Sequence, residues 1–177
     1  MPRNSITGVA TAGLLLLLMG CGRDAVDPAS FGSAAQVLRP LPEGQLPPGE
    51  RRALYIPVYS SIYWGMENGM VELAATLSVR NISEKHALIL HSVDYYDSHG
   101  TRIREYLKAP AELPPVATVE YVIQRKDRVG GPGANFIVRW SGDEGIDPPL
   151  IEAVMVGQSG NMGLSFTSRG VEIQDHR

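Results

Sequence analysis

The stretch "VELAATLSV", residues 71–79, decides the fold. Its larger apolar side chains occupy every second position: Val71, Leu73, Ala75, Leu77 and Val79. Successive side chains of a strand point to opposite faces, so this alternation predicts a strand with one face in a core and the other in solvent. No stretch of the sequence combines a sustained helical period with capping residues. The sequence therefore predicts an all-β protein.

Seven further segments have strand composition and are separated by turn-forming residues. They are residues 54–64, 87–97, 101–107, 118–124, 135–140, 151–156 and 164–167. Seven or eight short strands at this spacing predict an immunoglobulin-like antiparallel β-sandwich. A small β-barrel is the alternative.

Residues 1–20 have the layout of a secretory signal. Arg3 and the amino terminus precede an uncharged apolar stretch that is shorter than the roughly twenty residues a spanning helix needs. The following "LMGC", residues 18–21, resembles the bacterial lipobox. The resemblance implies that Cys21 is lipidated and that the chain is cleaved before it. The alternative is an ordinary secreted protein with a stray cysteine.

The predicted anchor also defines the expected location of the protein. Lipoprotein processing would leave two or three acyl chains on Cys21, enough to hold a protein firmly on a membrane. By resemblance to known lipoproteins, Gly22 in place of an aspartate favours the outer membrane, facing the periplasm, if the host is diderm. We expect residues 21–53, rich in proline and glycine, to be a flexible tether. Residues 54–170 would form the sandwich and residues 171–177 a polar tail.

Charge and cysteine content exclude several classes of function. The formal net charge of the 177 residues is −3, which argues against nucleic acid as a partner. Cys21 is the single cysteine, so lipidation would leave no thiol for a disulfide, a metal site or a nucleophile. The predicted partner through this residue is the membrane.

Several phrases of the predicted domain resemble one family. They are "YIPVYSSIYWG", "LAATLSVRN", "SVDYYDSHG", "GGPGANFIVRW", "IEAVMVG" and "SFTSRG". Together they are similar to a bacterial lipoprotein family in the series of domains of unknown function, number 3124. The resemblance covers residues 54–170. It implies an envelope protein, but it brings no known activity and therefore no site residues.

The histidines do not predict a metal site. His86 and His91 are an odd number of positions apart and therefore point to opposite faces of a strand. His99 lies roughly 40 Å from His86 along an extended strand, and His176 is in the predicted tail.

Two other motifs also fall short of a catalytic or metal site. "GQSGN", residues 157–161, lacks the second glycine and the following helix of a nucleophile elbow, so Ser159 is interpreted as a turn residue. The loop "SGDEGID" offers Asp143, Glu144 and Asp147 to calcium, but not at the spacing of a calcium-binding hand. The sequence therefore predicts no catalytic residue, no metal and no cofactor.

The segment "QRKDRVGGPGAN", residues 124–135, is a candidate anion-binding loop. Its basic residues precede glycines whose backbone N–H groups could form a nest: Arg125, Lys126, Arg128, Gly130, Gly131 and Gly133. A phosphate loop would need a following helix, whereas a strand follows here. A long hairpin loop is therefore favoured, with an anion or headgroup contact as the alternative.

Three tyrosines are the candidate partner-binding residues. Tyr55, Tyr59 and Tyr63 fall on one face of the predicted strand 54–64. Pro57 lacks a backbone N–H, which favours an edge position for this strand. An exposed edge with a tyrosine face could bind a partner, although tyrosine rings also pack readily in cores.

A predicted hairpin gives a structural hypothesis. If residues 135–140 and 151–156 pair around the acidic loop, Arg139 lies opposite Glu152, whose carboxylate would otherwise be isolated between apolar neighbours.

The sequence thus favours a membrane-anchored envelope lipoprotein that is a non-enzymatic binding or scaffold module, with a protein or glycan partner. The alternative is an envelope hydrolase or metal-dependent enzyme with a site built from loops. An enzyme of that kind should have a pocket with at least two titratable groups of shifted pKa.

Overall fold

The computed structural model describes residues 37–42, 49–65 and 69–174 of the chain. The predicted signal peptide, Cys21 and most of the predicted tether lie outside these residues. Within the described ranges, no helix is long and apolar enough to cross a membrane.

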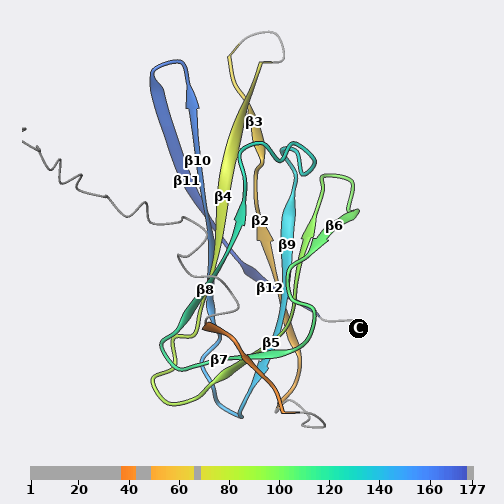
Figure 1. Ribbon diagram of the computed structural model, residues 1–177, viewed down its shortest axis with the longest axis vertical. Coiled ribbons are helices and arrows are strands. Elements are labelled where there is room, and N and C mark those ends of the chain that lie inside the picture. The colour runs from red at the N-terminus through yellow and green to blue at the C-terminus, as the bar shows by residue number, and fades with distance from the viewer. Residues whose placement is uncertain (1–36, 43–48, 66–68, 175–177) are drawn as a thin grey trace, which may run out of the picture.

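The described residues form two antiparallel sheets packed as a β-sandwich (Figure 1). The larger sheet has the order β1-β7-β5-β9-β2-β12, with β6 also beside β5. Its strands are β1 (Arg39–Pro40), β2 (Arg52–Pro57), β5 (Leu88–Tyr96), β6 (Arg102–Glu105), β7 (Ala111–Leu113), β9 (Asn135–Gly142) and β12 (Val171–Ile173). The smaller sheet has the order β11-β10-β4-β3, with β8 also beside β4. Its strands are β3 (Ser61–Tyr63), β4 (Met70–Arg80), β8 (Thr118–Ile123), β10 (Leu150–Ser159) and β11 (Met162–Arg169).

The antiparallel β-sandwich predicted from the sequence is confirmed, and the sheets do not close into the alternative small barrel. β4 has the predicted alternation, because its five apolar positions from Val71 to Val79 are all buried between the sheets. The structure has twelve strands rather than seven or eight. One reason is that each long inner strand is flanked on one side by two short ones: β5 by β6 and β7, and β4 by β3 and β8.

The predicted strand 54–64 is two strands in different sheets. β2 ends at Pro57, which lies opposite Asn135 of β9 in the larger sheet. The Val58 N–H then donates to the Ala134 carbonyl, and β3 begins at Ser61, opposite Glu72 of β4 in the smaller sheet. The chain therefore crosses between the sheets at residues 58–60. These three residues include no glycine or proline that would have indicated the end of a strand.

The prediction that this strand is an edge is wrong for β2. β2 lies between β9 and β12, and Pro57 is tolerated because it is the last residue of the strand. β12 supplies the outer neighbour, with Val171 opposite Tyr55. Residues 171–173 therefore belong to the sheet and not to a polar tail.

Two described parts of the expected tether also belong to the sheet. Arg39 and Pro40 form β1, opposite Glu112 and Ala111 of β7, and β2 begins at Arg52. Val37 and Leu38 pack against the core. Burial of these apolar side chains offsets the conformational entropy that this part of the proline-rich segment loses when it is ordered.

The predicted pairing of Arg139 with Glu152 is wrong, because β9 and β10 lie in different sheets. Arg139 lies 3.3 Å from the Asp94 carboxylate on neighbouring β5. Glu152 lies 3.9 Å from Arg80 on β4. The loop that was expected to turn a hairpin instead carries the chain from one sheet to the other.

Candidate binding surface

A hollow of about 400 Å³ lies beside the β3–β4 hairpin. We call it the hairpin groove, and its lining residues are Ser61, Met70, Glu72, Arg128, Gly131 and Pro132. One wall is the outer face of the β3–β4 hairpin and the other is the glycine-rich loop before β9. The groove therefore joins two segments that are more than fifty residues apart in the sequence.

The glycine-rich loop is held in place by two serine hydroxyls. Ser60 Oγ accepts a hydrogen bond from the Gly131 N–H at 2.7 Å, and Ser98 Oγ accepts one from the Gly133 N–H at 2.8 Å. The Ser60 N–H also donates to the Gly131 carbonyl. Gly131 has φ of +76°, a left-handed conformation that glycine adopts at little energetic expense. The groove wall is thus tied to the strand crossing at Ser60.

The buried Tyr95 ring packs directly against this loop at Gly130. A Cβ at Gly130 would overlap the Tyr95 hydroxyl and lie 2.9 Å from its Cζ. Tyr95 is fully buried, and burial raises the pKa of its hydroxyl to about 12. Gly130 therefore allows the loop to close directly onto the core.

An ion pair crosses the groove. Arg128 of the loop lies 2.5 Å from the Glu72 carboxylate of β4. Both groups are partly solvated, so this pair contributes little to stability but fixes the position of two charges at the wall.

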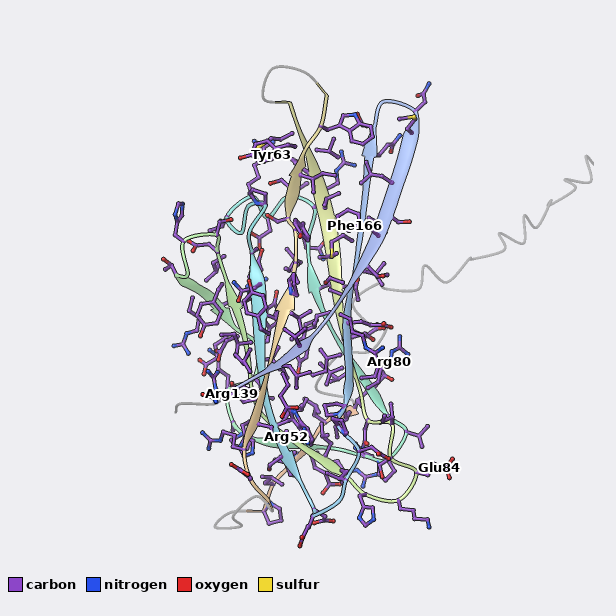
Figure 2. The ribbon with its side chains drawn as sticks, turned by 180° about the vertical axis from the view of Figure 1, so that it is seen from behind. Arg52, Tyr63, Arg80, Glu84, Arg139 and Phe166 are labelled. Carbon is purple, nitrogen blue, oxygen red and sulfur yellow. The ribbon has the colours of Figure 1, made fainter. Side chains whose placement is uncertain are left out.

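Tyr63 and Met70 continue the groove toward the end of the hairpin, where Trp64 is also exposed. Tyr63 lies opposite Met70 in the sheet register, and the Trp64 N–H donates to the Gly69 carbonyl across the hairpin. The exposed fractions are 70% for Tyr63, 42% for Trp64 and 48% for Met70. Figure 2 shows Tyr63 near the end of the molecule opposite Glu84. Large apolar side chains left in solvent next to a hollow are typical of an interaction site.

The three candidate tyrosines do not share one face. Tyr55 lies on β2 in the larger sheet, and Tyr63 lies on β3 in the smaller sheet. Tyr59 lies in the crossing between them and packs edge-on against Phe166, with ring centroids 5.6 Å apart. The sheet crossing separates them, and Tyr63 alone of the three adjoins the hairpin groove.

The candidate anion loop is also divided. Arg128 and Gly131 line the groove, whereas Arg125 and Lys126 are exposed to solvent at the start of the loop. The N–H groups of Gly131 and Gly133 already donate to serine hydroxyls. A nest for an external anion would have to compete with these bonds.

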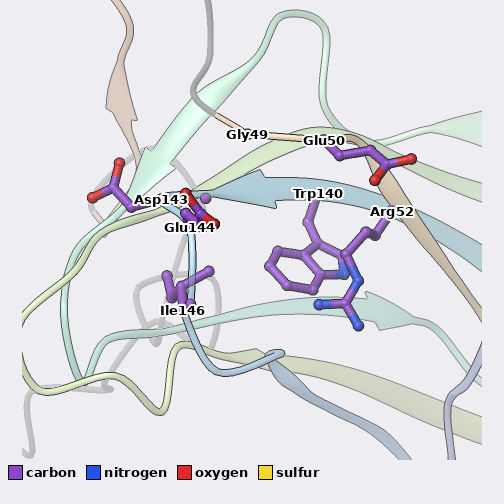
Figure 3. A pocket seen from close by; sticks show the side chains of 9 residues that line it. Gly49, Glu50, Arg52, Trp140, Asp143, Glu144 and Ile146 are labelled. Atoms are coloured by element: carbon purple, nitrogen blue, oxygen red, sulfur yellow. The ribbon is translucent and has the colours of Figure 1, made fainter.

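A second hollow, of about 370 Å³, is drawn in Figure 3, and Figure 2 shows its lining residue Arg52 in the half of the molecule away from Tyr63. Its aromatic wall is Trp140, and the Arg52 guanidinium lies 4.8 Å from the centroid of that ring. Arg52 donates two hydrogen bonds, of 2.6 and 2.7 Å, to the Glu172 carboxylate. This bonding raises the pKa of Arg52 and lowers the pKa of Glu172. Both pKa shifts thus arise from one surface ion pair. A ligand that bound Arg52 would have to compete with Glu172.

The remaining chemistry-bearing residues are dispersed. His86 lies 3.1 Å from Asp143, and His91 lies 2.9 Å from Ser141 at a bulge in β5. His99 is in the turn after β5, and Ser159 ends β10. Over the described ranges, no group of three or more His, Cys, Asp and Glu residues is placed to hold a metal.

Sequence reasoning missed most of the groove. Met70, Glu72 and Pro132 were not candidates. The available signal was the sequence "SIYWGMENGM", residues 61–70, in which two aromatics and a methionine flank a turn. Apolar residues beside a hairpin turn have no core within reach, so they are exposed unless a partner covers them.

The fold and the groove define the class of the protein as an antiparallel β-sandwich module with an exposed apolar hairpin. Residues 51–173 match the model of the family described as "Protein of unknown function (DUF3124)", and the chain belongs to this family. No curated protein matches the sequence.

One solved structure, titled "Crystal Structure of Thermotoga maritima 1070", is similar with a TM-score of 0.40 and 12% sequence identity. The match covers 68% of this chain and 92% of that chain.

Proposed function

We propose that this protein is a lipid-anchored bacterial envelope protein whose sandwich is a non-enzymatic binding module. The anchor would be Cys21, which follows a signal-like segment in a sequence that resembles the lipobox. The observation that carries the binding role is the hairpin groove, where Met70 is exposed opposite the exposed Tyr63.

The chemistry of the groove favours a protein partner over a glycan. Its apolar part combines an aromatic ring with methionine and proline, and methionine adapts to irregular apolar surfaces. Aromatic and methionine side chains are enriched in protein–protein interfaces. Glycan sites also use aromatic rings, but they need several polar side chains aimed at hydroxyl groups. In the groove, the Glu72 carboxylate is already paired with Arg128.

The position of the groove supports this role. The first described residues, 37–42, lie in the lower part of the molecule in Figure 1, whereas β3, the beginning of β4 and the β10–β11 turn lie in the upper part. A chain tethered through its N-terminal side could therefore present the groove away from the membrane. The outer membrane, with the domain in the periplasm, is our proposal for a diderm host.

Site-specific photocrosslinking in native membranes tests the binding role. A photoreactive residue at Tyr63 should form a crosslink to a defined envelope protein, and Met70→Glu should abolish that crosslink. The matched control is the same residue at Ile82, an exposed apolar position in the loop that carries Glu84 at the opposite end. Identical crosslinking patterns from positions 63 and 82 would contradict the proposal.

The anchor is tested separately. Cys21→Ser should leave the chain uncleaved or mislocalised, and the native protein should partition into detergent with the mass of attached lipid. Recovery of Cys21 as a free thiol in the mature protein would exclude the lipid anchor without bearing on the groove.

A further inference from the structure

β11 is a long edge of the smaller sheet, and Arg169 at its end is its single charged residue. It ends the strand order on one side, and its first seven residues, "MGLSFTS", carry no charge and no proline. Most of its residues are exposed to solvent. A strand of this kind is a template for pairing with another chain.

The other described edges carry features that block such pairing. β3 and β12 have three residues each and β1 has two, while β6 has the charged sequence "RIRE". The edge of β8 carries Glu120, and the Tyr106 hydroxyl donates to the Val122 carbonyl there at 3.3 Å. The absence of such features from β11 therefore sets it apart within the described chain.

One hydrogen bond assigns the backbone groups that β11 leaves open. The Gly170 N–H donates to the Ile151 carbonyl at 2.9 Å, which continues the register of β10 and β11. Bonded and non-bonded pairs alternate in an antiparallel ladder. The N–H and C=O groups of Gly163, Ser165 and Thr167 therefore point away from β10, toward the open side.

The sequence of β11 is complementary to itself when two copies run antiparallel about Ser165. In this register Ser165 faces the partner's Ser165, and Gly163 faces the partner's Thr167. Leu164 faces the partner's Phe166 in a non-bonded pair, where side chains approach most closely. A Cβ at Gly163 would meet no atom within 4 Å, so the sheet face at this position has room for a partner's side chain.

Charge does not oppose this arrangement. The nearest charged residue is Arg169, which would face the partner's Asn161 in the same register. Like charges directly opposite each other would have destabilised the pair. Two copies of the same chain therefore fit this edge without repulsion across it.

We propose that β11 pairs with β11 of a second copy about a two-fold axis at Ser165, so that the two smaller sheets form one continuous sheet. About six backbone hydrogen bonds would form, two at each of the three bonded pairs. This dimer goes beyond the proposed function, because the hairpin groove lies beside β3 at the other end of the strand order.

Removal of one backbone N–H group tests the pairing. The native lipidated protein, in excess detergent micelles, should sediment as a concentration-dependent dimer. Ser165→Pro removes an N–H that the fold does not use and should raise the dissociation constant at least about tenfold. Ser165→Ala, the matched control, should leave it unchanged, and thermal unfolding should be similar for both variants.

Charge pairing tests the register. Ser165→Lys and Ser165→Glu should each sediment as monomers, because position 165 faces itself across the axis. An equimolar mixture of the two should form a heterodimer. A monomeric native protein, or a Ser165→Pro variant that dimerises normally, would overturn the proposal, and a mixture that stays monomeric would overturn the Ser165 axis.

Discussion

The two sheets share one core but differ on their outer faces. On the larger sheet, Asp94 and Arg139 are only 1% and 7% exposed, and their side chains lie 3.3 Å apart. On the smaller sheet, Val122, Val154 and Val156 are all exposed on the outer face. Val122 and Val154 both lie opposite Thr76, on either side of β4.

The difference shows which outer face has its buried charges paired within its own sheet. On the larger sheet, Asp94 also lies 3.3 Å from Arg102, and Arg139 also donates to the Ser92 hydroxyl, so the two buried charges are paired within that sheet. The outer face of the smaller sheet instead leaves these three valines in solvent among polar residues. Both the hairpin groove and the β11 edge belong to this smaller sheet, so we expect association to occur there.

The largest expected effect comes from breaking the charge pair of the larger sheet. Asp94→Ala removes a carboxylate that faces the buried Arg139, and such a change destabilises a fold by about 3–5 kcal/mol. Chemical denaturation should show this loss. Replacing both residues, with Asp94→Leu and Arg139→Met, should recover most of it. A loss below about 1 kcal/mol for Asp94→Ala would show that this face does not depend on the pair.

A second contrast uses one glycine beside each sheet. Gly130→Ala would push a methyl group against the buried Tyr95 ring, and overpacking of this kind destabilises by about 1–3 kcal/mol. Gly163→Ala on β11 places the same methyl group in open space and should change stability by less than about 0.5 kcal/mol. Equal effects in thermal unfolding would contradict the assignment of a packed and an open side.

Alkaline pH should weaken both sheets together. Burial raises the pKa of Tyr95 in the larger sheet to about 12 and also raises the pKa of Tyr121 in the smaller sheet. Unfolded tyrosine ionises near pH 10, so the unfolded state loses these protons first. Their contribution to stability is complete below about pH 10 and decreases as the pH rises toward 12. Phenolate absorbance should therefore appear together with unfolding, and early titration of both groups would refute their burial.

The smallest expected effect is on the open face. Val154→Thr keeps a β-branched side chain on an exposed strand position and should change the free energy of unfolding by less than about 0.5 kcal/mol. The matched change in the core, Val138→Thr, places a hydroxyl group where the chain is fully buried and should lower stability by about 1–3 kcal/mol. Denaturant titration of the two variants compares an outer with an inner position directly.

Part of this architecture could be predicted from the sequence because it depends on local alternation. The alternation over residues 71–79 predicts β4 and its buried face without knowledge of its neighbours. β1 and β12 have two and three residues, too few for any alternation to be read. They exist because β7 and β2 present partners, which are long-range features.

The candidate site could be predicted only in pieces. Tyr63 and Arg128 were both candidates, yet nothing local indicates that they flank one groove. Their meeting depends on the crossing at residues 58–60, which brings Ser60 to the glycine-rich loop. The error over Arg139 has the same origin, because a loop between sheets and a hairpin loop have similar compositions.

The short strand β1 has a mechanical consequence. Tension applied from the N-terminal side would load β1 before β2, and β1 is held by two residue pairs and an exposed contact of 3.7 Å between Arg39 and Glu112. β2 is clamped on both sides by β9 and β12. We therefore expect β1 to detach first and release residues 37–51, which span about 50 Å when extended. The chain would lengthen by the difference between this extended length and the distance that these residues span in the folded domain, while the strands from β2 onward stay folded.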